Sequence, residues 1–137
     1  MMHRFMNLDI WNLGMDLAVE VYKVTKEFPK NETYGLQSES RRCCVSIPSK
    51  IAEGAQRIND AEFHLLLGDA AGSAAELITQ VVLAKRLGFI NSAERDTLVD
   101  KAEHIMNSIF KLQAKLKPKG KIVSDLKVAK KSESKKK

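Results

Sequence analysis

Hydrophobic residues recur at the spacing of an amphipathic helix in four successive segments of the chain. The first covers residues 10–28, the second residues 36–57, the third begins after Asn59 and the fourth after Asn91. Each asparagine is followed three positions later by a glutamate, which is the pattern of a helix N-cap. The connections are short, about two to eight residues, and such lengths favour antiparallel neighbours. The pattern predicts an all-α protein, an antiparallel up-down-up-down four-helix bundle. A three-helix bundle with a mobile first helix is the alternative.

Residues 10–28 carry more hydrophobic surface than one core requires. One stripe runs from Ile10 to Phe28, and a second stripe lies beside it on the same predicted helix. Together they cover an arc of about 200°, whereas a helix packed on a single core needs roughly 100°. A hydrophobic strip left in solvent usually marks an interface, so we expect a homo-oligomer. The second stripe consists of Trp11, Met15, Ala18 and Tyr22.

The second predicted helix contains a proline, Pro48, in its middle. A proline there removes one backbone hydrogen bond and clashes with the carbonyl four residues earlier, that of Cys44, at a cost of about 3 kcal/mol. We therefore predict a kinked second helix, with polar side chains of the second and third helices as partners at the kink. A small residue nearby would let a neighbouring helix approach closely. The residues expected at the kink are Ser46, Pro48, Glu53, Gly54, Glu76 and Gln80.

The third predicted helix is hydrophobic around most of its circumference, which is typical of the most buried helix in a bundle. Its most hydrophobic run, residues 70–84, is too short to span a bilayer, and the N-terminus lacks the hydrophobic run of a signal peptide. Cys43 and Cys44 are adjacent, so their side chains point about 100° apart on a helix, which favours small buried thiols in a reducing compartment over a disulfide. We expect a cytoplasmic protein without membrane association.

The positive charge is concentrated at the C-terminal end. The chain has a net charge of +6, but residues 115–137 hold ten lysines and two acidic residues, a net charge of +8 that leaves −2 for the rest. Because hydrophobic residues are sparse after Pro118, we predict a bundle over residues 1–117 and a disordered basic tail over residues 118–137. The candidate nucleic-acid contacts are Lys119, Lys121, Lys127, Lys130, Lys131, Lys135, Lys136 and Lys137 of the tail, with Arg41, Arg42, Lys50 and Arg57 of the second helix.

No arrangement of residues predicts catalysis. Di-iron bundles use Glu-x-x-His pairs, and neither His64 nor His104 has a glutamate three positions earlier. Asp60 and Asp100 precede these histidines by four positions, a spacing typical of weak surface ion pairs. We therefore expect a protein that is not an enzyme and that has no metal and no cofactor.

The stretch YGLQSESRRCCVSIPSKIAEG, preceded by DIWNLGMDLAVEVYKVTKEFPK and followed by GSAAELITQVVLAKRLGFI, resembles a family of four-helix-bundle proteins. These proteins are encoded in intervening sequences of bacterial large-subunit (23S) ribosomal RNA genes, and the resemblance covers about Leu8 to Leu116. It implies a bundle that assembles into a homopentamer, but no established activity. A related branch is the accessory protein of diversity-generating retroelements, which works with a reverse transcriptase and nucleic acid. This sequence departs from the family pattern at Glu39, Lys50 and Ile78.

Two functional hypotheses follow from these observations. The first is a non-enzymatic oligomer that associates with RNA, or with DNA, through its basic tails. Such contacts would be independent of sequence, because the tail has no arginine to read bases and no aromatic residue to stack on them. The alternative is a protein-interaction scaffold, for example a reverse-transcriptase accessory-type protein, whose lysines only keep it in solution.

Overall fold

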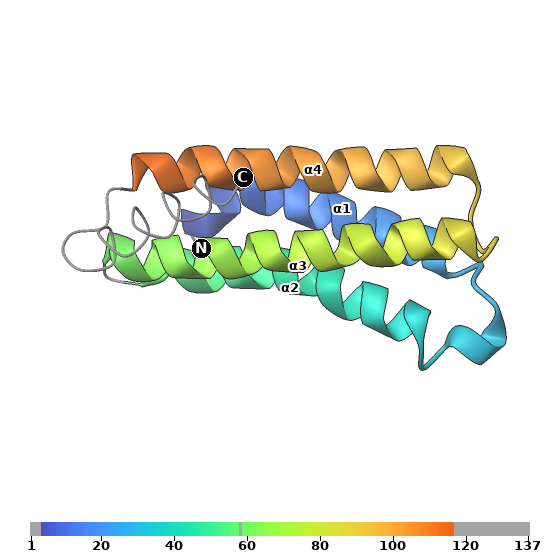
Figure 1. The fold of residues 1–137 in the computed structure, drawn as a ribbon. Helices are drawn as coiled ribbons and strands as arrows, with labels where there is room; N and C mark the ends of the chain where they lie inside the picture. Colours follow the sequence, from blue (N-terminus) through green and yellow to red (C-terminus); the bar gives the residue numbers. More distant parts are fainter. Residues whose placement is uncertain (1–3, 58, 117–137) are drawn as a thin grey trace, which may run out of the picture.

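The computed structural model describes residues 4–57 and 59–116, which form four long helices running side by side in up-down order (Figure 1). The predicted all-α four-helix bundle is therefore confirmed. The predicted tail, residues 118–137, lies outside the described residues. The elements are the short 3₁₀ helix η1 (Arg4–Asn7), α1 (Asp9–Thr25), the short 3₁₀ helix η2 (Lys30–Glu32), α2 (Leu36–Ala55), α3 (Asp60–Arg86) and α4 (Ser92–Lys115).

The N-termini of α3 and α4 are capped by the two asparagines that precede them. The side chain of Asn59 accepts a hydrogen bond from the Glu62 N–H at 2.8 Å. At α4 the capping box is complete, because the Glu94 N–H donates to Asn91 at 2.7 Å and the Asn91 N–H donates to the Glu94 carboxylate at 2.9 Å. Gly88, just after α3, has a φ of 80°, a left-handed conformation that glycine adopts without strain. Local sequence signals therefore define these helix ends.

Each helix packs on two neighbours, and α1 and α3 lie on opposite corners of the bundle. The α1 helix contacts α2 and α4, and α3 contacts the same two helices from the other side. Close approach at the centre depends on Gly14 of α1, because a Cβ there would lie 3.3 Å from both Pro48 and Ile105. The core between the helices is made of fully buried side chains that include Leu17, Val21, Ile47, Ile51, Leu67, Leu77, Ile105 and Ile109.

The α3 helix is less buried than predicted. This helix was expected to be the most buried, yet seven of its 27 residues are buried, compared with seven of 20 in α2. The prediction is wrong because no helix among the described residues covers the outer side of α3, where Leu65 and Leu83 are exposed. By length and composition alone, the whole of α3 is long and hydrophobic enough to cross a membrane. The sequence prediction considered only residues 70–84, which are too few to do so.

Candidate functional site

The α2 helix continues through Pro48, and its N-terminal part slopes away from α3 (Figure 1). Pro48 is buried and packs on Gly14 of α1. The hydroxyls of Ser46 and Ser73 share a hydrogen bond of 2.9 Å that ties α2 to α3 just before the proline. Gly54 lies one and a half turns further on, where a Cβ would come within 2.7 Å of the Phe63 ring. Gly54, the small residue predicted to allow a close approach, therefore lies at a close contact between α2 and α3.

The polar side chains of α3 meet a cysteine rather than the proline. The Cys43 thiol lies 3.5 Å from the Glu76 carboxylate, and the Gln80 amide donates to its sulfur at 3.4 Å. Within the described residues, no side-chain hydrogen bond reaches the Cys44 carbonyl that the proline was expected to free. Glu76 and Gln80 therefore contact Cys43 and not that carbonyl, so the prediction that they are its partners is wrong.

Burial makes both thiols poor nucleophiles. It is the main cause that raises the pKa of Cys43, and it raises the pKa of Cys44 to about 12. At neutral pH both side chains are therefore protonated thiols, which react slowly.

Glu53 lies away from the kink. Its carboxylate forms ion pairs with Lys50 of α2 at 3.5 Å and with Arg57, just after α2, at 3.1 Å, and its side chain is 43% exposed. The prediction that Glu53 joins a polar network at the proline is wrong, because the side chain points to the outer surface and meets one cation of α2 and one just after its end.

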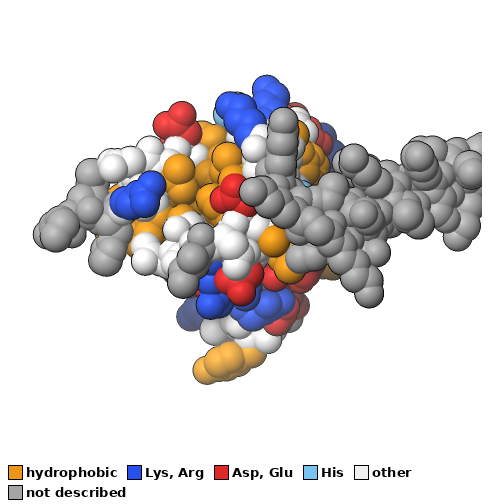
Figure 2. Space-filling view, turned by 90° about the vertical axis from the view of Figure 1, so that its left-hand side faces the viewer, with side chains coloured by type: hydrophobic (Ala, Val, Ile, Leu, Met, Phe, Trp, Pro, Cys, Tyr) orange, Lys and Arg blue, Asp and Glu red, His pale blue; other side chains and the backbone are white. Residues whose placement is uncertain are grey.

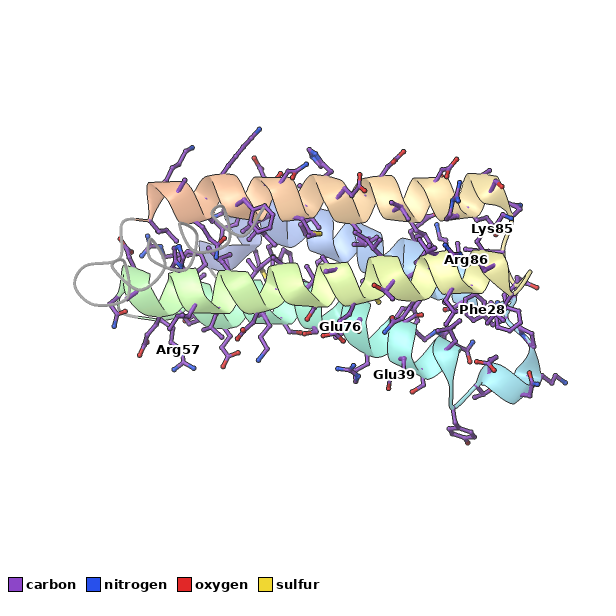
Figure 3. All side chains as sticks on the ribbon, viewed as in Figure 1. Phe28, Glu39, Arg57, Glu76, Lys85 and Arg86 are labelled. Atoms are coloured by element: carbon purple, nitrogen blue, oxygen red, sulfur yellow. The ribbon has the colours of Figure 1, made fainter. Side chains whose placement is uncertain are left out.

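The four basic residues predicted on the second helix, of which Arg57 lies just after α2, do not form one surface. Arg42 pairs with Glu39 at 3.0 Å and lies 3.6 Å from Glu76, where α2 diverges from α3. Arg57 lies at the opposite end of the bundle (Figure 3). Since Lys50 and Arg57 share the carboxylate of Glu53, three of the four cations are offset by acidic neighbours. Arg41 is different, because no carboxylate of the described residues forms an ion pair with it.

Arg41 is held against α1 by three contacts. Its Nε donates to the Thr25 hydroxyl at 3.0 Å, and one terminal nitrogen donates to the Tyr22 carbonyl at 3.3 Å. The guanidinium also lies 4.4 Å from the centre of the Tyr22 ring, within the range of a cation–π interaction. The cation is therefore fixed in place while its charge is not neutralised.

A cleft of about 530 Å³ opens where the connection after η2 meets α1 and α2. Arg41 and Arg42 contribute the charged side chains of its wall, and none of the described residues that line it is acidic. Tyr34, in the connection before α2, is 96% exposed. Neither Tyr34 nor the cleft could be predicted from the sequence, since only the fold brings this connection beside α1. The cleft is lined by Tyr22, Thr33, Tyr34, Gln37, Ser38, Arg41, Arg42 and Val45.

The hydrophobic strip predicted on α1 is present in altered form. Met15 and Tyr22 are exposed as predicted, whereas Trp11 and Ala18 are partly buried against the core. Trp11 also packs on Phe5 of η1, with ring centres 5.6 Å apart. The prediction is wrong for Trp11 and Ala18 because η1 and the neighbouring helices cover them. The exposed strip, called the α1 strip below, consists of Met15 and Val19, and Tyr22 of α1 and Val45 of α2 continue it into the wall of the cleft.

A second surface, of exposed leucines and small residues beside the carboxylates of Asp69 and Glu76, lies on the outer side of α3. Leu65 and Leu83 are 50% and 45% exposed at its two ends. Small residues lie between them, and a Cβ placed at Gly72 would meet no atom within 4 Å. Since α1 and α3 occupy opposite corners of the bundle, this surface faces away from the α1 strip. The surface, called the α3 face below, consists of Leu65, Gly68, Gly72, Ala75, Thr79 and Leu83.

The end of the bundle where α3 begins carries another cavity, of about 420 Å³. It lies between η1, α2, α3 and α4, and its wall mixes hydrophobic side chains such as Phe63 and Leu116 with Arg4, Arg57 and Asp60. Figure 2 looks at this end and shows hydrophobic side chains gathered near the centre, with charged groups around them. Within residues 4–57 and 59–116, no group of three histidine, cysteine, aspartate or glutamate side chains is arranged to hold a metal ion.

Comparisons with known proteins agree with the fold. The model of a protein family described as "23S rRNA-intervening sequence protein" matches residues 6–111. A crystal structure of a protein with unknown function from the S23 ribosomal protein family of Bacteroides thetaiotaomicron VPI-5482 superposes with a TM-score of 0.70. The two chains are 21% identical over 76% of this chain and 97% of that one. No curated protein matches this chain.

Proposed function

Because the chain belongs to the 23S rRNA-intervening sequence protein family, we propose that it is a non-enzymatic homo-oligomer that associates with RNA through its lysine-rich C-terminal residues. The observation that carries the proposal is the uneven charge, +8 in residues 115–137 against −2 in the rest of the chain. Ammonium groups attract phosphates whatever the base sequence, and such binding weakens as salt rises. The free and buried thiols fit a reducing compartment such as the cytoplasm.

Assembly would multiply these weak contacts. Several tails on one particle engage a single RNA together, so the affinity of the assembly exceeds that of one tail. Two surfaces support assembly. The α1 strip is built from larger side chains, Met15 and Val19, whereas the centre of the α3 face is small, at Gly68 and Gly72. Two different surfaces on opposite sides of one subunit favour head-to-tail contacts, which close into a ring when the rotation permits. The family resemblance suggests five subunits.

The test compares two full-length proteins across a salt series. One is the natural chain, and in the other the eight candidate lysines of the tail are replaced by glutamine, which keeps the length and removes the charge. We expect the natural chain to bind unrelated RNA sequences with similar affinity, to lose affinity as salt rises, and to bind more tightly than the variant. Equal affinity of both proteins at low salt, or no binding by either, would refute the tail as the RNA-binding element.

The α3 face supports a second candidate function, that of a protein-interaction scaffold such as a reverse-transcriptase accessory-type protein. Its small residues would let a partner helix approach closely. The same binding experiment separates the two functions, because a scaffold needs no affinity for RNA. The replacement Gly72→Leu would block a partner helix on this face and, because the same face supports assembly, would also lower the affinity for RNA that several tails provide together.

A further inference from the structure

The cleft beside α1 and α2 holds two kinds of chemistry that the lysine tail lacks, an arginine and an exposed aromatic ring. We propose that this cleft binds a nucleotide unit of single-stranded RNA, with the phosphate on Arg41 and the base stacked on Tyr34. The inference rests on the proposed association with RNA and deepens it, because it adds a defined site that distinguishes unpaired from paired strands.

Arg41 has the properties of an anion-binding residue. Its contacts to Thr25 and Tyr22 are a hydroxyl, a carbonyl and an aromatic ring, none of which carries a negative charge. They fix the plane of the guanidinium without cancelling its charge. An arginine that is already ordered loses less side-chain freedom when it binds a phosphate, and its fork geometry suits phosphate oxygens. Arg42, in the same wall, is offset by Glu39 and Glu76, so Arg41 supplies the available charge.

Tyr34 has the properties of a base-stacking residue. Its ring is 96% exposed, the highest value among the exposed large hydrophobic side chains of the described chain, so its packing contributes little to the fold. Stacking of unpaired bases on aromatic side chains is a common mode of single-strand recognition, because every base has a π-face. A base within a duplex is already stacked on its neighbours and cannot use the ring in this way.

The dimensions of the cleft favour a strand over a free nucleotide. Its volume of about 530 Å³ lies in the range of small-molecule sites. Sites for free small ligands, however, enclose most of the ligand surface, whereas the ring of Tyr34 stands almost wholly in solvent. An open site of this kind lets a strand continue past it in both directions. Ser38, Gln37 and Thr33 add neutral polar groups to the wall that can hydrogen-bond to ribose or base.

The experiment uses the full chain and fluorescently labelled 12-nucleotide single-stranded RNA, with a duplex of the same length beside it. Tyr34→Ala removes the stacking ring, and Ser38→Asp places a negative charge in the cleft from an exposed position. Each variant has a matched control: Phe110→Ala removes a partly exposed aromatic ring from α4, and Ser49→Asp adds the same charge further along α2. Affinities are measured by anisotropy at low and moderate salt.

We expect Tyr34→Ala and Ser38→Asp each to weaken single-strand binding by about fivefold or more, while the controls and the duplex affinity stay within about twofold. Unchanged single-strand affinity in both cleft variants would overturn the site. If only the glutamine-substituted tail lowers affinity, the proposed function stands and this inference falls. If only the cleft variants lower affinity, the cleft site stands and the tail is refuted as the RNA-binding element.

Adenosine monophosphate distinguishes a strand from a free nucleotide. If it displaces labelled RNA from the natural chain at micromolar concentration as well as an unlabelled strand does, the ligand is a free nucleotide and the strand assignment is overturned. Weak displacement, at millimolar concentration or above, supports the strand.

Discussion

Gly54→Ala is expected to destabilise the bundle relative to a matched glycine replacement on α3. A Cβ at position 54 would lie 2.7 Å from a carbon of the Phe63 ring and 3.1 Å from the Cβ of Leu66. The second atom is attached directly to the backbone of α3, so the helices themselves must move apart. Overpacking of this kind costs about 1–3 kcal/mol. Alanine returns roughly 0.5–1 kcal/mol through its higher helix propensity.

The matched control is Gly72→Ala on the exposed side of α3, where an added Cβ meets no atom within 4 Å. It gains the helix propensity without the clash, so its free energy of unfolding should rise by about 0.5–1 kcal/mol. The two variants should therefore differ by about 1–3 kcal/mol, which is the steric cost alone. Urea melts followed by circular dichroism measure this difference. They are run at two protein concentrations, because assembly adds to apparent stability. Equal stabilisation by both replacements would refute the close contact between α2 and α3.

Three further outcomes are expected. Val19→Glu should shift the protein toward smaller species in analytical ultracentrifugation while helicity is retained, because Val19 is 54% exposed within the α1 strip; Lys101→Glu on α4 is the control, and equal sedimentation of both variants would count against the strip. Glu76→Gln should change the free energy of unfolding by less than about 1 kcal/mol, since its side chain is 60% exposed and exposed ion pairs contribute little; a larger loss in a urea melt would show that the contact with Cys43 is structural. Burial raises the pKa of both thiols, that of Cys44 to about 12, so both are protonated at pH 8. A thiol reagent at pH 8 should therefore label Cys43 and Cys44 only on unfolding; rapid labelling of the folded protein would contradict their burial.

Helix positions and caps could be predicted from sequence because they depend on near neighbours in the chain. Asn59 and Asn91 cap their helices through residues three positions away. The prediction for α1 was less accurate at its end, which was placed at Phe28 rather than Thr25. The last turn tightens there, since the Phe28 N–H donates to the Thr25 carbonyl three residues back. Hydrophobic spacing does not distinguish such a turn from a continued helix.

The candidate surfaces were predicted less well, because spacing gives the angular position of a side chain on its own helix and not what covers it. Trp11 and Met15 belong to one stripe, yet η1 places Phe5 against Trp11 and leaves Met15 exposed. Glu53 and Glu76 were both assigned to the kink from their polarity. Only the packing shows that Glu53 meets Lys50 and Arg57, whereas Glu76 meets Cys43.

Pro48 connects the fold to the candidate RNA site. The proline packs on Gly14 of α1, so the middle of α2 is held close to α1. The N-terminal part of α2 slopes away from α3 in Figure 1, yet it remains tied to α1 through Arg41 and its contacts to Thr25 and Tyr22. The hydrogen bond from Gln37 to the Thr25 carbonyl, at 2.8 Å, adds a second tie one turn earlier. The middle of α2 is therefore held on α1 by the packing of Pro48, and its N-terminal part by the hydrogen bonds of Gln37 and Arg41. These contacts hold Arg41, which forms no ion pair with a carboxylate of the described residues, at the wall of the cleft.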